Sequence, residues 1–541
     1  MDNNEKLVVV LSRNYSTGLS VIRSLGTKGY TVDLVASAPR EGASAFIAKS
    51  KFVRNAYEAV SKKVKQEEDT ELVDILLAYE GQWPTKPVLV AADDYTASVM
   101  DKNSDKLKNI FLMPGILGGE PGSLTHMMDK SVQGKIARSV GIKTPKEWVV
   151  SLREEEFDIP EDMIYPCYVK PLGSTFGYKQ EMARCNDIDE LKAHLQKLRE
   201  SYSDRSILVQ EFMFIDEEYD LEGVCMDQDI VIPGIVFKEF VAQYDRGVPL
   251  YGEFFAVEKF GAFMEKVYEF LREFHYFGMF DLGFNVIDGE YYFNELNLRS
   301  GGTNYVYFES GANLSEIFVK AALGENLDPE ECKAKVFGKK YLYEKVAWDD
   351  YFHKYLTKDQ LNNCTETADI HIMVNDYDPI PGEIFMEEVT AEEKRLRRKE
   401  LRNQAINKTM EDTGWDREQA KEKLRETREH MDVSYKDYAA FKLWRFPLEE
   451  QEEAYQKALK KRERLKKQRE EAITYAMDIM GWSEEEAKAQ IKDARERLGI
   501  SYKDYTKYRF CLVPLENQAE EYDKILIAKE KEKEQKEQKE Q

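Results

Sequence analysis

The C-terminal part of the sequence repeats itself at a constant offset of 67 residues. The dipeptide Gly-Trp at 414 recurs at 481, SYKDY at 434 recurs at 501, and Pro-Leu-Glu at 447 recurs at 514. A constant offset across separate motifs indicates a duplicated structural unit. Gly and Pro are rare in this part, while Lys, Glu, Arg, Gln and Ala dominate, so we expect each copy to be helical.

The distribution of charge separates this region from the rest of the chain. Residues 391–541 contain 36 basic and 35 acidic residues, whereas residues 1–390 contain 42 basic and 66 acidic ones. The net charge of −23 therefore lies in the first part, which disfavours a nucleic-acid partner. A change in charge of this kind marks a boundary between domains. We predict four segments, at 1–124, 125–330, 331–390 and 391–541.

The sequence also indicates a cytoplasmic protein. No run approaches the ~18 apolar residues of a membrane span, and the N-terminus has no basic-then-apolar signal pattern. The six cysteines and six histidines are scattered along the chain. We expect free or packed thiols in a reducing compartment, with no zinc site.

The first 120 residues show the pattern of an open α/β sheet. The apolar run at 6–12, the amphipathic stretch at 19–28 and the run at 30–35 predict a strand, a helix and a strand, and further strands are expected at 88–91 and 110–113. Ligands of such sheets bind beyond the carboxyl ends of the strands, which singles out Arg13, Asn14, Asp93 and Asp94. The alternative is that these residues cap helices and form turns.

Residues 125–330 predict a second, mixed region. We expect a helix that begins at Asp129-Lys130, strands at 165–170, 207–212, 219–225 and 230–237, a helix at 260–274, and a hairpin whose strands cover 280–287 and 291–296. Asp288-Gly289 is a typical hairpin turn.

The strongest chemical signal lies in this hairpin. Strand alternation places Glu295 and Asn297 on one face, and Asp281 lies on the preceding strand. Two carboxylates and an amide oxygen suit a hard cation such as Mg²⁺, which also takes phosphate oxygens. Arg299 follows directly and can bind phosphate in a forked manner. The alternative is a polar strand end closed by turn residues.

Two other strand ends carry candidate nucleotide contacts. Lys170 precedes the glycine-bearing loop 173–177, where it would neutralise a phosphate that the loop covers. The strand that ends at Gln210-Glu211-Phe212 would present its backbone to an adenine, with Glu217 and Glu218 near the ribose. Taken one at a time, such Lys and Glu residues are more often solvated surface.

These motifs resemble the ATP-grasp fold. DK at 129, YVKP at 168, LVQEF at 208 and the pair FDLGFNV and FNELNLR between 280 and 299 occur in the order and spacing of that family. The resemblance covers about residues 1–385. The segments VLVAADDYTASV and MDKSVQGKIARSVGIKTP look most like the branch of D-aspartate ligase and carbamoyl phosphate synthase. The implied fold class is α/β, an open sheet that precedes the ATP-grasp α+β subdomains, followed by an all-α tandem-repeat region.

The resemblance implies a set of site residues. The metal ligands would be Asp281, Glu295 and Asn297. The ATP-binding residues would be Lys130, Lys170, Ser174, Thr175, Gln210, Glu211, Phe212, Met213 and Glu218. The substrate residues would be Arg13, Asn14, Asp93, Asp94, Arg299, Ser300 and Gly301, with Arg299 and Lys170 as catalytic residues. Met279 departs from the family, because some relatives have a basic residue there.

The implied activity is that of a carboxylate–amine ligase with ATP and Mg²⁺ as cofactors, or Mn²⁺ in place of Mg²⁺. It would form an amide through an acyl phosphate and release ADP and phosphate. The substrates would be a small carboxylate and an amine, such as an amino acid, a peptide or a cell-wall precursor. The alternatives are a carboxylate–thiol ligase, an ATP-dependent kinase, or a binding or scaffold protein with a vestigial nucleotide site.

Two interpretations of the C-terminal repeats remain open. Their Tyr, Trp and Arg side chains would recognise a partner protein or a polymeric substrate, or the aromatic residues would form the cores of small helical units. The last residues, KEKEKEQKEQKEQ, predict a charged helix or a disordered tail.

Overall fold

A computed structural model describes residues 6–13, 15–60, 69–172 and 182–540. The chain divides into two compact units, residues 1–391 and residues 392–541, which we call the body and the C-terminal unit. The predicted classes, α/β for the body and all-α for the region after it, are confirmed. The divisions at 124 and 330 within the body stay predictions.

The N-terminal sheet of the body is parallel, with strand order β3-β2-β1-β4. Its strands are β1 (Leu7–Ser12), β2 (Thr31–Ala38), β3 (Val53–Val60) and β4 (Val88–Ala91). The apolar strands β1 and β4 are buried on both faces, as expected for a parallel sheet. The sequence did not reveal β3, because this edge strand is mostly exposed and its Arg, Asn and Glu residues interrupt the apolar pattern. The strand predicted at 110–113 is wrong, since only Leu112 forms an isolated bridge with Val88.

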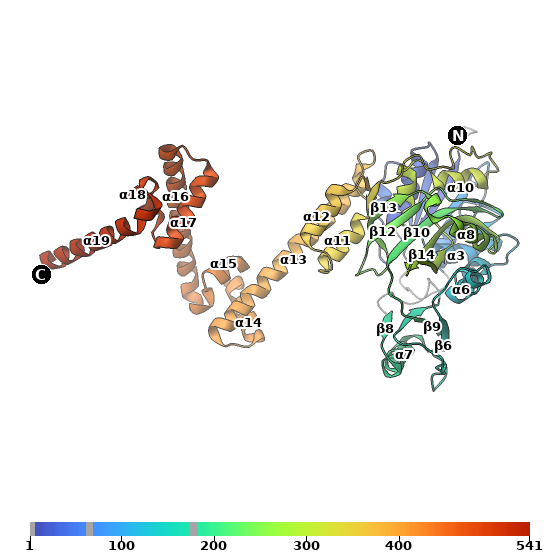
Figure 1. Cartoon of the computed structure of the whole chain (residues 1–541), viewed down its shortest axis with the longest axis horizontal. Coiled ribbons are helices and arrows are strands. Elements are labelled where there is room, and N and C mark those ends of the chain that lie inside the picture. Colours follow the sequence, from blue (N-terminus) through green and yellow to red (C-terminus); the bar gives the residue numbers. More distant parts are fainter. Residues whose placement is uncertain (1–5, 14, 61–68, 173–181, 541) are drawn as a thin grey trace. The chain divides into compact units, whose positions relative to one another are not determined.

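The central sheet is largely antiparallel and contains the predicted hairpin (Figure 1). Its main strand order is β15-β14-β10-β12-β13-β16-β17, with β11 beside β10 and β5 beside β14. The strands are β5 (Gly115–Ile116), β10 (Glu217–Met226), β11 (Asp229–Val231), β12 (Ile235–Val241), β13 (Pro249–Phe255), β14 (Tyr276–Ile287), β15 (Glu290–Asn297), β16 (Lys340–Leu342) and β17 (Ile370–His371). The single strand predicted at 230–237 is therefore two strands, β11 and β12.

A smaller antiparallel sheet has its own apolar core and forms a separate lobe of the body in Figure 1. Its strands follow the order β6-β9-β7-β8 and are β6 (Glu147–Ser151), β7 (Cys167–Pro171), β8 (Ala183–Cys185) and β9 (Ser206–Glu211). Cys167 and Cys185, far apart in sequence, are directly paired residues of adjacent strands, and both are free thiols.

Helices cover the sheets of the body. They are α1 (Tyr15–Gly26), α2 (Thr70–Leu77), α3 (Asp94–Lys102), α4 (Ser104–Leu107), α5 (Ser123–Met127), α6 (Lys130–Ser139), α7 (Ile188–Tyr202), α8 (Ala262–Arg272), α9 (Asn304–Glu309), α10 (Leu314–Ala322), α11 (Glu344–Phe352) and α12 (Lys358–Thr367). Alternation along β14 turns Phe280, Leu282 and Phe284 into the apolar cluster of α8, so Asp281 points to the opposite face. Met279 shares that opposite face and is buried in the cluster of α10.

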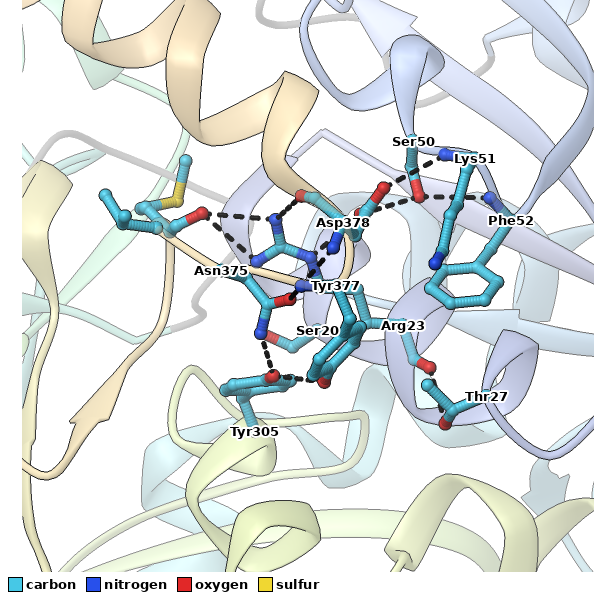
Figure 2. Close-up of polar contacts among 12 residues, drawn as sticks. Ser20, Arg23, Thr27, Ser50, Lys51, Phe52, Tyr305, Asn375, Tyr377 and Asp378 are labelled. Carbon is cyan, nitrogen blue, oxygen red and sulfur yellow. Dashed lines mark hydrogen bonds and ion pairs between the residues drawn. The ribbon is translucent and has the colours of Figure 1, made fainter.

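A fully buried ion pair ties the segment before α13 (Pro379–Thr413) to helix α1 (Figure 2). The Nε of Arg23 donates to Asp378 Oδ2 at 2.9 Å, and both side chains are almost completely excluded from solvent. The two Nη atoms of Arg23 donate to the carbonyl oxygens of Ile372, Met373 and Asp378. Every guanidinium nitrogen thus has an acceptor, as a buried charge requires.

The C-terminal unit consists of helices in which the duplication is visible. They are the remainder of α13, α14 (Arg417–His430), α15 (Tyr435–Ala440), α16 (Leu448–Met480), α17 (Glu484–Leu498), α18 (Tyr502–Lys507) and α19 (Gln518–Glu540). Tyr438 and its equivalent Tyr505 lie in two separate apolar clusters, so these aromatic residues are core. In the described part of the chain, no helix has the length and apolar character needed to cross a membrane.

The buried pair predicts a large loss of stability on single substitution. Asp378→Asn leaves Arg23 charged and buried without its counter-ion, which we expect to cost about 3–5 kcal/mol. The matched control is Glu325→Gln, which removes the exposed pair between Lys6 and Glu325 and should cost less than about 1 kcal/mol. Calorimetric melting of the full chain measures both, and equal melting temperatures of the body in the two variants would contradict the prediction.

Candidate active site

One face of the central sheet carries a row of acidic side chains. Glu218, Asp220 and Glu222 alternate along β10, and the antiparallel register places Glu222 opposite Asp281 and Asp220 opposite Gly283. A Cβ atom at Gly283 would lie only 3.3 Å from Asp220 Oδ1, so this glycine leaves room for the carboxylate. The sheet therefore gathers negative charge on the face that bears the predicted metal ligands.

The structure brings the predicted metal ligands onto adjacent strands. Asp281 pairs in register with Asn297, and Asn297 Nδ2 donates to Asp281 Oδ2 at 3.3 Å. Glu295 lies opposite Gly283, beyond an irregularity in the pairing of β14 with β15. Among the described residues, no three His, Cys, Asp or Glu side chains are grouped closely enough to hold a metal ion by themselves. A set of two carboxylates with an amide oxygen still has the hard-donor chemistry that Mg²⁺ accepts when waters and phosphate complete its shell.

Arg299 links this face to the N-terminal sheet. Its Nε donates to Asp94 Oδ1 at 3.0 Å, and its Nη1 donates to Asp281 Oδ2 at 2.8 Å. Burial opposes the charged form of Arg299, but the two carboxylates outweigh it and raise the pKa of the guanidinium further above its usual range. Asp94, predicted as a substrate residue, is thus connected through Arg299 to Asp281 of the predicted metal site.

The two predicted phosphate lysines lie on the same side. Lys130 begins helix α6, is nearly buried and forms an ion pair with the carboxylate of Glu295. Its backbone N–H donates to the carbonyl oxygen of Leu172 at 3.0 Å, two residues after Lys170. Burial, and then the positive charge of Lys130, lowers the pKa of Lys170 to about 8. A nearby anion, such as a phosphate group, would favour the charged form of this lysine and raise its pKa.

The predicted adenine strand β9 is built as expected, but part of its backbone is already used. The N–H of Glu211 donates to Lys146 O at 2.8 Å, and the N–H of Phe212 donates to Pro166 O at 3.0 Å. These two N–H groups therefore have acceptors within the protein. The side chain of Gln210 donates to Glu147 Oε2 at 3.3 Å. Met213 follows directly after these residues, where β9 has ended.

The substrate residues predicted in the N-terminal sheet lie at the carboxyl ends of β1 and β4. Asp93 caps helix α3 by accepting from Thr96 N–H at 2.9 Å, and it also accepts from the backbone N–H of Arg13 at 2.6 Å. The guanidinium of Arg13 stacks over Tyr95 at 4.4 Å. The capping alternative thus holds for Asp93. Asn14, Ser174 and Thr175 lie outside the described residues.

The loop after Arg299 is held by a glutamate that the sequence analysis did not select. Glu222 accepts from the backbone N–H groups of Gly301 and Thr303 at 3.1 and 2.9 Å. A Cβ atom at Gly301 would lie 2.3 Å from the Glu222 carboxyl carbon, so only glycine allows this approach. Burial, and then the charge of Asp281, raises the pKa of Glu222 to about 8.

A buried lysine on β12 also escaped the sequence analysis. Lys238 forms an ion pair with Asp220 at 2.7 Å and lies 3.9 Å from Glu218. Burial raises the pKa of Asp220 to about 7, although the charge of Lys238 lowers it in part. The alternating acidic residues of β10 could have indicated it, because carboxylates on a buried strand need a nearby cation.

Comparison with curated proteins identifies relatives that match part of this chain. The carbamoyl phosphate synthase large chain of Vibrio cholerae is 22% identical over 236 residues, which cover 43% of this chain and 22% of that protein. The D-aspartate ligase of Enterococcus faecium is 22% identical over 258 residues, which cover 42% of this chain and 57% of the ligase. The chain thus spans about a fifth of the first protein and just over half of the second. The predicted resemblance to this branch of ligases is confirmed.

Comparison with solved structures gives weaker similarities. An L-amino acid ligase from Bacillus licheniformis aligns with a TM-score of 0.46 and 15% identity, over 60% of this chain and 76% of that one. A biotin carboxylase from Campylobacter jejuni aligns with a TM-score of 0.49 and 15% identity, over 62% and 75%. No family model matches the sequence.

The lowered pKa of Lys170 predicts pH-dependent nucleotide binding. As the pH rises through about 8, Lys170 loses its proton in the free protein. Nucleotide phosphates would favour the charged form, so binding should take up a proton, and the affinity for ATP should fall by up to about tenfold per pH unit between pH 8 and 9. Lys170→Arg stays charged and should flatten this dependence, whereas Lys170→Ala should weaken binding at every pH. Calorimetry in buffers of different ionisation enthalpy measures the proton uptake, and identical pH profiles for the wild type and Lys170→Arg would contradict the assignment.

Proposed function

We propose that this chain, whose body is related to carbamoyl phosphate synthase and D-aspartate ligase, is an ATP- and Mg²⁺-dependent carboxylate–amine ligase. ATP would phosphorylate a substrate carboxylate, an amine would attack the acyl phosphate, and an amide, ADP and phosphate would leave. The observation that carries the proposal is the arrangement of Asp281, Glu295 and Asn297 beside Lys130 and Arg299.

The residues of this chain would act by position and by charge. Asp281, Glu295 and Asn297 would hold Mg²⁺, which supplies charge neutralisation at the phosphates. Lys130 and Lys170 would bind phosphate oxygens at the open side of the acidic face. Asp94 and Asp281 hold the guanidinium of Arg299 in one orientation. There it would stabilise negative charge on the phosphate or the acyl phosphate. No nucleophilic side chain is needed for this chemistry.

The edge next to Arg299 supplies two donors for an anionic substrate. Arg13 Nη1 and Ser300 Oγ are buried and have no acceptor among the described residues. Ser300 reaches β4 through its N–H, which donates to Ala91 O at 3.4 Å, and Arg13 follows β1 directly. Buried donors are normally paired, so an acceptor such as a substrate carboxylate would satisfy them. We assign the carboxylate substrate to this edge on that basis.

The test is a screen of amino-acid pairs for ADP formation, with mass spectrometry of the products. Hydroxylamine in place of the amine should trap the acyl phosphate as a hydroxamate once the right acid is present. A kinase that phosphorylates a hydroxyl gives ADP without hydroxamate. Release of AMP and pyrophosphate would overturn the proposal, and an absence of turnover with intact nucleotide binding would favour the scaffold alternative.

Substitution at the metal set should separate chemistry from folding. Glu295→Gln removes one anionic ligand, and we expect ADP formation to fall by at least about a hundredfold. Glu290→Gln is the matched control, because Glu290 lies on the same strand in an exposed pair with Lys143. The control should keep wild-type activity, and circular dichroism should show the same fold for both. Wild-type turnover by Glu295→Gln at saturating substrate would remove Glu295 from the metal site.

A further inference from the structure

The C-terminal unit contains the same cleft twice, once in each repeat. The first cleft, of about 420 Å³, is lined by Arg402, Glu418, Lys421, Glu422, Leu424, Arg425, Arg428, Glu429 and Tyr435. The second, of about 520 Å³, is lined by Arg469, Ile473, Lys488, Ala489, Ile491, Lys492, Arg495, Glu496 and Tyr502. Eight positions of the two linings correspond at the offset of 67, so the duplication preserved the cleft together with the helices.

We propose that each repeat uses this cleft to bind carboxylate groups of an acidic polypeptide. The proposal does not depend on the activity of the body. Each cleft is lined by four basic side chains, at equivalent positions, together with one tyrosine. The clefts have the size of sites that hold small ligands or a few residues of a peptide.

In both clefts one arginine is held in place against the tyrosine. The guanidinium of Arg428 lies 4.3 Å from the ring of Tyr435, and its Nε donates to Val433 O at 3.2 Å. In the second repeat, Arg495 lies 3.8 Å from the ring of Tyr502 and its Nε donates to a carbonyl oxygen at 3.1 Å. In the first repeat Nη1 of Arg428 also donates to the hydroxyl of Tyr435 at 2.7 Å. Each Nη atom carries two N–H groups, so the remaining ones can still donate to a carboxylate.

Two arginines of each cleft have no counter-ion in the described part of the chain, whereas Arg425 of the first cleft pairs with Glu422 and Glu429. Among the residues that the structure describes, none of the guanidinium groups of Arg402, Arg428, Arg469 and Arg495 lies within ion-pair distance of a carboxylate. The lysines beside them are paired, since Lys421 contacts a glutamate of its own helix at 2.5 Å. Each cleft therefore offers two arginines whose charge an incoming anion would neutralise.

Comparison of the two copies shows where substitution is tolerated. Charges outside the clefts have reversed between the repeats, as in Glu400 against Lys467 and Arg417 against Glu484. Inside the clefts Arg402, Arg428 and Tyr435 recur as Arg469, Arg495 and Tyr502, and Arg425 against Lys492 keeps the positive charge, while Glu422 against Ala489 removes a negative one. All four basic positions of the cleft have therefore kept their positive charge through the duplication.

The remaining lining favours a polypeptide as the occupant. Glu418, Glu422 and Glu429 line the first cleft and Glu496 lines the second, and these carboxylates would repel a continuous polyphosphate. A peptide brings isolated carboxylates, which the arginines can bind. It also brings backbone N–H groups, which can donate hydrogen bonds to the glutamates. The partly exposed rings of Tyr435 and Tyr502 provide apolar contacts for side-chain methylene groups.

The test is fluorescence anisotropy with the full chain and a labelled peptide of about 12 residues that alternates Glu with Gly. It is run at about 0.15 M salt, where diffuse surface attraction is largely screened. A peptide with Gln in place of Glu serves as the uncharged probe. Unlabelled oligonucleotide and anionic vesicles serve as competitors from other ligand classes.

The decisive variant is Arg402→Gln with Arg469→Gln, because no hydrogen bond of these two arginines is described whose loss would disturb the fold. Arg397→Gln with Arg464→Gln is the matched control, since these exposed arginines are also identical in the two repeats, lie on the same two helices and do not line the clefts. Arg428→Gln with Arg495→Gln is a second cleft variant, checked by circular dichroism.

We expect the glutamate peptide to bind and the glutamine peptide not to bind. The cleft variants should raise the Kd by about tenfold or more, and the control pair by less than about twofold. Equal losses in the cleft and control variants would overturn the proposal, because they would indicate diffuse electrostatics. It would also be overturned by an absence of binding to the glutamate peptide, or by stronger binding to the oligonucleotide or the vesicles.

Discussion

The guanidinium of Arg299 is the cation against which the acidic face of the central sheet is arranged. It bridges Asp94 of the N-terminal sheet region and Asp281 of β14, so two parts of the body distant in sequence meet at one side chain. Buried carboxylates are costly unless cations or hydrogen bonds compensate them. Lys238 and the backbone N–H groups that face Glu222 provide the remaining compensation. The ion pairs of Arg299 and Lys238 with these carboxylates therefore hold the side chains of this face in fixed positions.

The sequence predicted most of the strands around the site, because local chemistry specifies them. The Asp288-Gly289 turn and the alternation of Glu295 and Asn297 determine the hairpin without reference to distant residues. The edge strand β3 was missed because its apolar and polar residues do not alternate regularly. It is ordered by its pairing with β2. Glu222 was missed for a related reason, since its role depends on a loop 79 residues later. Local pattern predicts elements, whereas partners across the sheet follow from tertiary structure.

The core interpretation of the C-terminal repeats holds for some of their aromatic residues, and the recognition interpretation stays a proposal. Tyr438 and Tyr505 are core residues, while Tyr435 and Tyr502, three positions earlier, support the arginines of the clefts. Tyr435 and Tyr502 are the first residues of α15 and α18 and stay partly exposed, whereas Tyr438 and Tyr505 lie inside these short helices and are buried. One short motif thus serves both the folding of the unit and its surface chemistry, and this explains why it survived duplication unchanged.

The buried pair of Arg23 and Asp378 has a consequence for synthesis on the ribosome. The two residues are 355 positions apart, so helix α1 is made long before the carboxylate that neutralises its arginine. Until then, the acceptors at Ile372 and Met373 are missing as well. An N-terminal sheet that closed early would enclose an uncompensated charge. A nascent chain that ends before residue 372 therefore has neither the carboxylate nor the carbonyl oxygens that pair with Arg23 in the complete body.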